Sequence, residues 1–89
     1  YAFKDINPLA PVHILVVPKK HISSAAEINA ENASAAAHIF EAAAKIAKEQ
    51  GIAEDGYRIV TNIGENGCQS VKHLHFHILG GRKLDVTMG

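Results

Sequence analysis

The chain has 89 residues, enough for one small domain whose single hydrophobic core gives only marginal stability. Nine basic residues balance nine acidic ones, so the basic excess that duplex DNA or an anionic membrane would require is missing. A single cysteine, Cys68, excludes an internal disulfide, and the sequence has neither a signal peptide nor an apolar run of about 20 residues. We expect a soluble, cytoplasmic protein that binds neither nucleic acid nor membrane.

The chain opens with two predicted strands. Residues 1–5 read as the end of a strand, and the turn-forming residues 7–11 close it. Residues 12–17 form an apolar run that Pro18 stops, which is typical of a buried strand. Strand alternation places His13 on the same face as Leu15 and Val17.

A long helix is predicted next. Two serines offer caps for a short helical turn over residues 25–28, and good helix formers fill residues 33–50. Gly51 supplies the expected C-terminal stop. Apolar residues recur at intervals of three and four, which predicts a stripe that packs on a sheet: Ile39, Phe40, Ala43, Ile46 and Ala47.

Two more strands follow the helix. A turn at residues 55–56 leads to a predicted strand over residues 57–62, and a loop rich in Gly and Asn at residues 64–69 precedes a strand over residues 71–79. Four strands in hairpin order with one long helix predict an α+β fold, in which the helix packs on an antiparallel sheet. Exposed sheet edges and the small size of the domain favour a homodimer.

The last strand carries half of the six histidines, at His73, His75 and His77. Side chains alternate across a strand, so the three imidazoles share one face and the opposite face is apolar, with Leu74, Phe76 and Ile78. The simplest alternative is an exposed, merely polar face, but three imidazoles in one register favour a functional site. The middle residue, His75, is the natural candidate to meet a substrate.

Other chemistry is also compatible with these residues. His-x-His on one strand is a zinc-ligand spacing, and His13 could add a ligand from a neighbouring strand. Cys68 could act as a nucleophile near the imidazoles. For His21 and His38 we expect structural or exposed positions.

The pattern His-φ-His-φ-His-φ-φ, with φ apolar, resembles the histidine triad (HIT) superfamily, and residues 73–79 fit it completely. Further matching segments are Asp5–Pro8, Pro11–Ile22, Gly56–Arg58, Asn62, Gly67–Val71 and Leu79–Arg82. Within the superfamily, Gln-Ser-Val before the triad and Gly-Gly-Arg after it resemble the Hint branch of purine nucleoside phosphoramidases. The resemblance implies a single HIT domain over residues 1–89, without the family's N-terminal strand and helix, and a sheet extended across a homodimer.

The Hint branch hydrolyses adenosine 5′-monophosphate joined to an amine through a P–N bond, and related acyl-adenylates. The resemblance implies that His75 is the nucleophile and forms a nucleotidyl-histidine intermediate that water cleaves. Its second ring nitrogen must then stay protonated, held by a backbone carbonyl, so that the attacking nitrogen keeps its lone pair. His77 would contact the phosphate and the leaving group, and His73 and His13 would complete the polar shell.

The nucleotide-binding residues are likewise implied by the resemblance. Cys68 and Ser70 match positions that contact the phosphate, and many relatives have glycine in place of Cys68. Asn62 matches a contact to the ribose or phosphate. Asp5 matches the carboxylate that accepts both ribose hydroxyls, and Ile6 matches the apolar wall against the purine.

Relatives with an upstream Cys-x-x-Cys bind structural zinc through that pair and residues that match His13 and His73. No such cysteines are present in this sequence. We therefore expect no required cofactor and keep a structural zinc ion as an alternative. A non-catalytic nucleotide-binding or interaction module is a further alternative.

Overall fold

The computed structural model describes residues 1–5 and 8–87 of the chain. These residues form four strands, one 3-10 helix and one α-helix. The elements are, in chain order, β1 (Ala2–Lys4), β2 (Val12–Val16), the 3-10 helix η1 (Ala25–Glu27), α1 (Ala33–Glu49), β3 (Arg58–Val60) and β4 (Phe76–Gly80).

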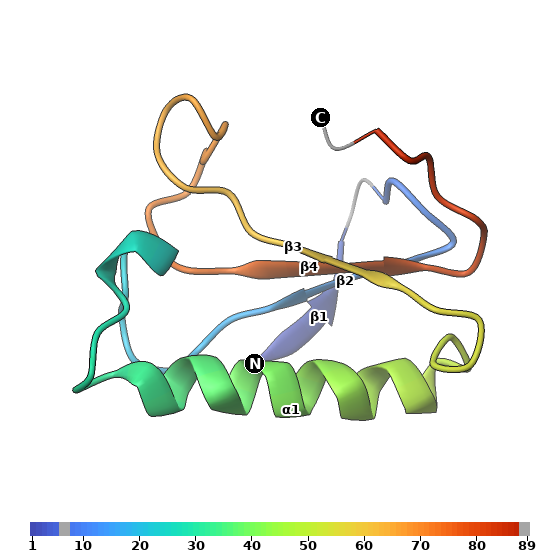
Figure 1. Cartoon of the computed structure of the whole chain (residues 1–89), viewed down its shortest axis with the longest axis horizontal. Coiled ribbons are helices and arrows are strands. Elements are labelled where there is room, and N and C mark those ends of the chain that lie inside the picture. The colour runs from blue at the N-terminus through green and yellow to red at the C-terminus, as the bar shows by residue number, and fades with distance from the viewer. Residues whose placement is uncertain (6–7, 88–89) are drawn as a thin grey trace.

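The strands pair antiparallel in one sheet of order β1-β2-β4-β3. The last strand of the sequence, β4, therefore lies in the middle of the sheet, between β2 and β3. Along one face of the sheet runs α1 (Figure 1). This arrangement confirms the predicted α+β fold, an antiparallel sheet with one long helix packed on it.

The core fills the space between α1 and the sheet. Its most deeply buried side chain in the sheet is Ile78 of β4, which is 0% exposed. The whole buried cluster consists of Ile14, Val16, Ile22, Ile39, Ala43, Ala47, Ile52, Leu74, Phe76 and Ile78. Because strand side chains alternate, burying Ile14 and Ile78 on this face turns His13 and His77 to the opposite face.

Local signals explain where the helices begin and end. The hydroxyl of Ser24 caps η1 by accepting a hydrogen bond from the Ala26 N–H at 3.2 Å. After α1, Gly51 adopts a left-handed conformation with φ of 73°, as its place after the helix predicts. Among the described residues, no helix has the length and apolar character needed to cross a membrane.

Several predicted strand bounds and one predicted buried residue need correction. The histidine strand, predicted over residues 71–79, begins only at Phe76, because β2 ends at Val16, the partner of Phe76. The other strands are also shorter at their ends than predicted. Phe40, assigned to the buried stripe, is 52% exposed and meets the Phe76 ring edge-on. The other stripe residues are buried or pack against the core: Ile39, Ala43, Ile46 and Ala47.

Candidate active site

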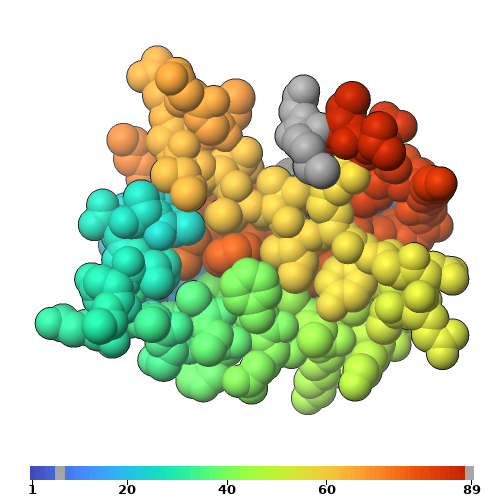
Figure 2. Space-filling model, in the orientation of Figure 1, coloured from blue at the N-terminus to red at the C-terminus, as the bar shows by residue number. Residues whose placement is uncertain are grey.

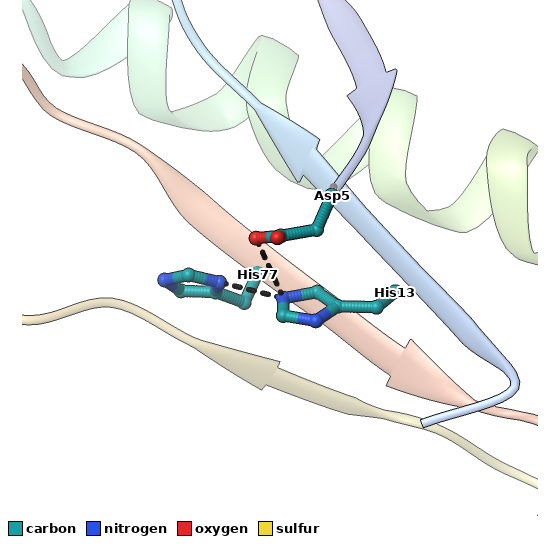
Figure 3. A group of neighbouring side chains, drawn as sticks. All are labelled: Asp5, His13 and His77. Carbon is teal, nitrogen blue, oxygen red and sulfur yellow. Dashed lines mark hydrogen bonds and ion pairs between the residues drawn. The ribbon is translucent and has the colours of Figure 1, made fainter. Parts of the chain in front are cut away.

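Two histidines from neighbouring strands meet on the sheet face away from α1. The pairing of β2 with β4 places His13 opposite Leu79 and Leu15 opposite His77, so that the two histidines are diagonal neighbours. Nε2 of His13 lies 2.9 Å from Nδ1 of His77. Figure 3 shows the two rings facing each other across this contact. His13 is only 5% exposed, so this contact is largely shielded from water.

The loop before β2 fixes the tautomers of both rings. The backbone N–H of Leu9 donates to Nδ1 of His13 at 3.0 Å. Because an N–H group can only donate, Nδ1 of His13 is unprotonated and the neutral ring carries its proton on Nε2. That Nε2–H donates to Nδ1 of His77. The proton of a neutral His77 ring must therefore lie on Nε2.

His75 lies beside His77, with 5.2 Å between the ring centroids and the rings edge to face. Its Nδ1–H donates to the backbone carbonyl of His73 at 2.8 Å. A carbonyl can only accept, so the neutral His75 ring keeps its lone pair on Nε2. The backbone carbonyl that the sequence analysis required for the second nitrogen is present.

Both rings open onto a cavity of about 370 Å³. Its lining residues are Leu9, Val60, Asn62, Cys68, Ser70, His75, His77 and Leu79. Five of the predicted site residues thus line one cavity. The loop with Cys68 and Ser70 projects from the side of the sheet away from α1, where Figure 2 shows it in orange. Such a loop of small residues beside two imidazoles has the size and chemistry to receive a phosphate group.

Side-chain amides brace that loop from within. The Asn62 amide donates to the Gly67 carbonyl at 2.7 Å, so its NH₂ group already has a partner. The Gln69 side chain accepts from the Gly64 N–H at 3.0 Å and donates to the Ser23 carbonyl at 2.6 Å. The loop is therefore attached both to its own start and to the segment before η1.

Asp5 reaches the histidine pair from the end of β1. Its Oδ2 lies 3.6 Å from Nε2 of His13, and Figure 3 shows it with both histidines. Ligand atoms of Asp5, His13 and His77 all lie within 4.8 Å of one another, which is compatible with a zinc ion. A metal on Nε2 of His13 would move the ring proton to Nδ1 and so break the hydrogen bond from Leu9. Ile6, the predicted purine wall, lies outside the described residues.

His73 differs from its predicted surroundings. Its Nδ1 lies 3.0 Å from Nδ1 of His21, and its Nε2–H donates to the Pro18 carbonyl at 3.3 Å. The imidazole partner of His73 is thus His21. Among the described residues, the group that could hold a metal ion consists of Asp5, His13 and His77 and does not include His73. His21 and His38 are both exposed, as expected.

The surroundings of His77 favour its neutral form. Burial lowers the pKa of the His77 ring, and repulsion by the neighbouring His75 and His13 rings lowers it further. The Asp5 carboxylate opposes this effect without reversing it. His77 is therefore a neutral N–H donor near pH 7.

Comparison with known proteins agrees with this geometry. Residues 1–84 match the family model of the HIT domain. The chain belongs to the HIT family. A solved HIT family hydrolase from Clostridium thermocellum superimposes with a TM-score of 0.94 at 50% sequence identity, covering 98% of this chain and 76% of that one.

Two relatives of this HIT domain have informative names. The purine nucleoside phosphoramidase of Escherichia coli K12 is 48% identical over 83 residues, which are 93% of this chain and 70% of that protein. The 14 kDa zinc-binding protein of Zea mays is 44% identical over 90 residues, covering 99% of this chain and 70% of that protein. Together with the Clostridium structure, the first relative identifies this HIT domain as a hydrolase.

Sequence reasoning missed several residues of this HIT domain's site. Val60 and Leu79 line the cavity, and their strand alternation with Asn62 and His77 could have revealed them. Leu9 acts through its backbone N–H and is 71% exposed, so its side chain carried no signal. Thr61 donates a hydrogen bond to the His75 carbonyl from outside the cavity lining, and nothing in the local sequence pattern distinguished this residue.

Proposed function

We propose that this HIT domain hydrolyses the P–N bond of purine nucleoside 5′-phosphoramidates, or the related acyl-phosphate bond of acyl-adenylates. The reaction proceeds through a nucleotidyl-histidine intermediate on His75. The single observation that carries the proposal is the hydrogen bond from Nδ1 of His75 to the His73 carbonyl, at 2.8 Å. It leaves a nucleophilic nitrogen free beside a loop suited to phosphate.

In the first step, Nε2 of His75 attacks the phosphorus with its lone pair. A P–N bond forms to His75 as the P–N bond to the amine breaks, and the amine takes the bonding electrons. Water then attacks the phosphorus of the intermediate and gives up a proton to solvent, which balances the proton taken by the amine. This step releases the nucleoside monophosphate and returns the electron pair to Nε2. Neutral imidazole suits both steps, because it is nucleophilic near pH 7 and leaves readily from phosphorus.

The departing amine takes a proton from solvent, and His77 is placed to stabilise the leaving group by donating a hydrogen bond. With its Nδ1 accepting from His13, the neutral His77 ring carries its proton on Nε2. The adjacent His75 ring, 5.2 Å away between centroids, puts this donor beside the reacting phosphorus. In this proposal His77 donates a hydrogen bond to the phosphate and the leaving group, and His13 and Leu9 set its tautomer.

The remaining predicted roles concern the nucleotide. We propose that Cys68 and Ser70 contact the phosphate and that Asn62 contacts the ribose or phosphate, because all three line the cavity with His75. Asp5 would accept the ribose hydroxyls, since a carboxylate can accept from two adjacent hydroxyls at once. Purine nucleoside phosphoramidase, the name of the Escherichia coli relative, supports this substrate class.

A zinc-binding module is the second candidate function. The group of Asp5, His13 and His77 favours it, as does the name of the Zea mays relative. A zinc ion held there would not occupy Nε2 of His75. The two candidates thus differ in whether activity depends on a metal.

The test measures release of adenosine monophosphate from adenosine 5′-phosphoramidate, with and without a chelator. The wild-type chain should turn over in both conditions, and His75→Ala should be inactive in both. His38→Ala, which alters an exposed imidazole on α1, is the matched control and should match the wild type. Activity that survives in His75→Ala, or is lost on chelation, would contradict the proposal.

A further inference from the structure

His75 precedes the hydrogen-bonded ladder of the sheet. The pairing of β3 with β4 ends at Val60 opposite His77, and β4 itself begins at Phe76. A nucleophile outside the ladder needs another means of fixing its backbone, because its carbonyl has no strand partner there.

Thr61, the residue after β3, supplies that contact. Its Oγ1–H donates to the backbone carbonyl of His75 at 2.8 Å, and the contact is partly buried. A carbonyl can only accept, so the direction of this hydrogen bond is certain. Where the ladder stops, a side-chain hydroxyl takes its place.

The substrate cavity does not include Thr61. Its neighbours Val60 and Asn62 both line the cavity, and the side chain between them does not. Any effect of Thr61 on the reaction must therefore pass through the backbone of His75.

We propose that Thr61 is a positioning residue for the nucleophile, an inference that rests on the proposed function of His75. Two hydrogen bonds then hold this residue: its ring nitrogen Nδ1 donates to the His73 carbonyl, and its own carbonyl accepts from Thr61. Without the second bond, the peptide of His75 can rotate and move Nε2 away from the line of attack on phosphorus. Reactions of bound groups are sensitive to such displacements.

The experiment compares Thr61→Val, which has nearly the same shape but no hydroxyl, with Thr61→Ser, which keeps the hydroxyl. Thr87→Val makes the same substitution at an exposed site and is the matched control. Each variant is assayed for kcat and KM with adenosine 5′-phosphoramidate, at a temperature where thermal unfolding shows it to be folded. Thr61→Ala replaces Thr61→Val if the latter does not fold.

We expect Thr61→Val to lower kcat about tenfold with KM unchanged, because only alignment in the transition state is lost. Thr61→Ser and Thr87→Val should stay within about twofold of the wild type. A wild-type kcat in Thr61→Val would overturn the inference. So would equal losses in Thr61→Val and Thr61→Ser, or a loss confined to KM.

A second readout separates this inference from the proposed function. In ¹⁵N spectra of the imidazoles, wild-type His75 should show a single, sharp Nε2 resonance with the proton on Nδ1, and in Thr61→Val this resonance should shift or broaden because the ring moves. If the wild type does not hydrolyse the substrate, the proposed function fails and these spectra decide the positioning role. An unchanged Nε2 resonance in Thr61→Val would then refute it.

Discussion

The imidazoles of the site are each held at one ring nitrogen by a group whose hydrogen-bonding role is fixed. The Leu9 N–H can only donate to His13, and the His73 carbonyl can only accept from His75. Two backbone groups thereby determine which nitrogen of each ring is free for chemistry. The backbone thus fixes the tautomers of the imidazoles in the site.

The proton on His77 should matter most when the departing amine is strongly basic. His13→Ala removes the donor to Nδ1 of His77, so the ring can turn to the wrong tautomer. We expect kcat to fall about 100-fold for an alkylamine substrate, and less for an arylamine substrate that leaves without a proton. His38→Ala is the control for loss of an imidazole. Equal losses with both amines would contradict the assignment of His77 as the hydrogen-bond donor to the leaving group.

Cys68 should show backbone strain. Its φ of 62° lies in the left-handed region, which costs a residue with a side chain about 1–2 kcal/mol relative to glycine. Replacing Cys68 with glycine removes this cost, but the unfolded chain with glycine has greater conformational entropy, which offsets part of the stabilisation. Cys68→Gly should therefore stabilise the domain by up to about 1 kcal/mol. Cys68→Val should destabilise it. Urea unfolding measures both, and a destabilising Cys68→Gly would show that the strain is absent.

In the histidine segment, the alternation of side-chain burial and the extent of strand pairing do not coincide. Burial alternates from His73 to Ile78 as predicted, with each histidine partly exposed and each apolar residue buried. The ladder nevertheless begins only at Phe76, because its extent depends on where β2 and β3 end. Local alternation therefore predicts the face of each side chain and leaves the strand ends undetermined.

The same segment makes β4 the centre of the core. Ile78 is 0% exposed, so Ile78→Ala should lower the free energy of unfolding by about 3 kcal/mol through lost burial and a cavity. Ile63→Ala, at a position 45% exposed, is the matched control and should change it by less than about 0.5 kcal/mol. Chemical denaturation tests the pair, and similar losses at both positions would show that the core lies elsewhere.

Much of the architecture of the whole molecule could be predicted from the sequence, because the chain has clear periodicity and a specific histidine motif. The α+β fold and the long helix followed from periodicity, whereas Asn62, Cys68 and Ser70, which line the cavity with His75, were implied by the resemblance to the HIT superfamily. The partner of His73 did not follow, because His21 is 52 residues away and no local pattern links them. The Leu9 N–H was also unpredictable, since every residue except proline carries this group.

Stability of the whole domain should depend on pH through His77. Its folded pKa lies below the unfolded value of about 6.5, so the unfolded state binds more protons as pH falls through that value. Stability is therefore lost on acidification and regained as pH rises toward 7. His77→Asn should show a shallower dependence in thermal unfolding at constant ionic strength. Parallel curves for the two proteins would contradict the lowered pKa.

The homodimer remains a prediction from the size of the domain and the resemblance. Sedimentation equilibrium measures the mass directly, and the dimer should persist at micromolar concentration. A monomeric mass at all protein concentrations would rule out the homodimer.

If Nε2 of His75 forms a bond to phosphorus, the nucleotidyl-histidine intermediate can be trapped during turnover. The wild-type chain is mixed with adenosine 5′-phosphoramidate, quenched within one turnover in alkaline denaturant that preserves the P–N bond, and weighed by mass spectrometry. We predict a mass increase of one adenylyl group, assigned to His75 by peptide fragmentation and absent in His75→Ala. Turnover without this adduct, or an adduct on Cys68 or another histidine, would contradict nucleophilic attack by His75.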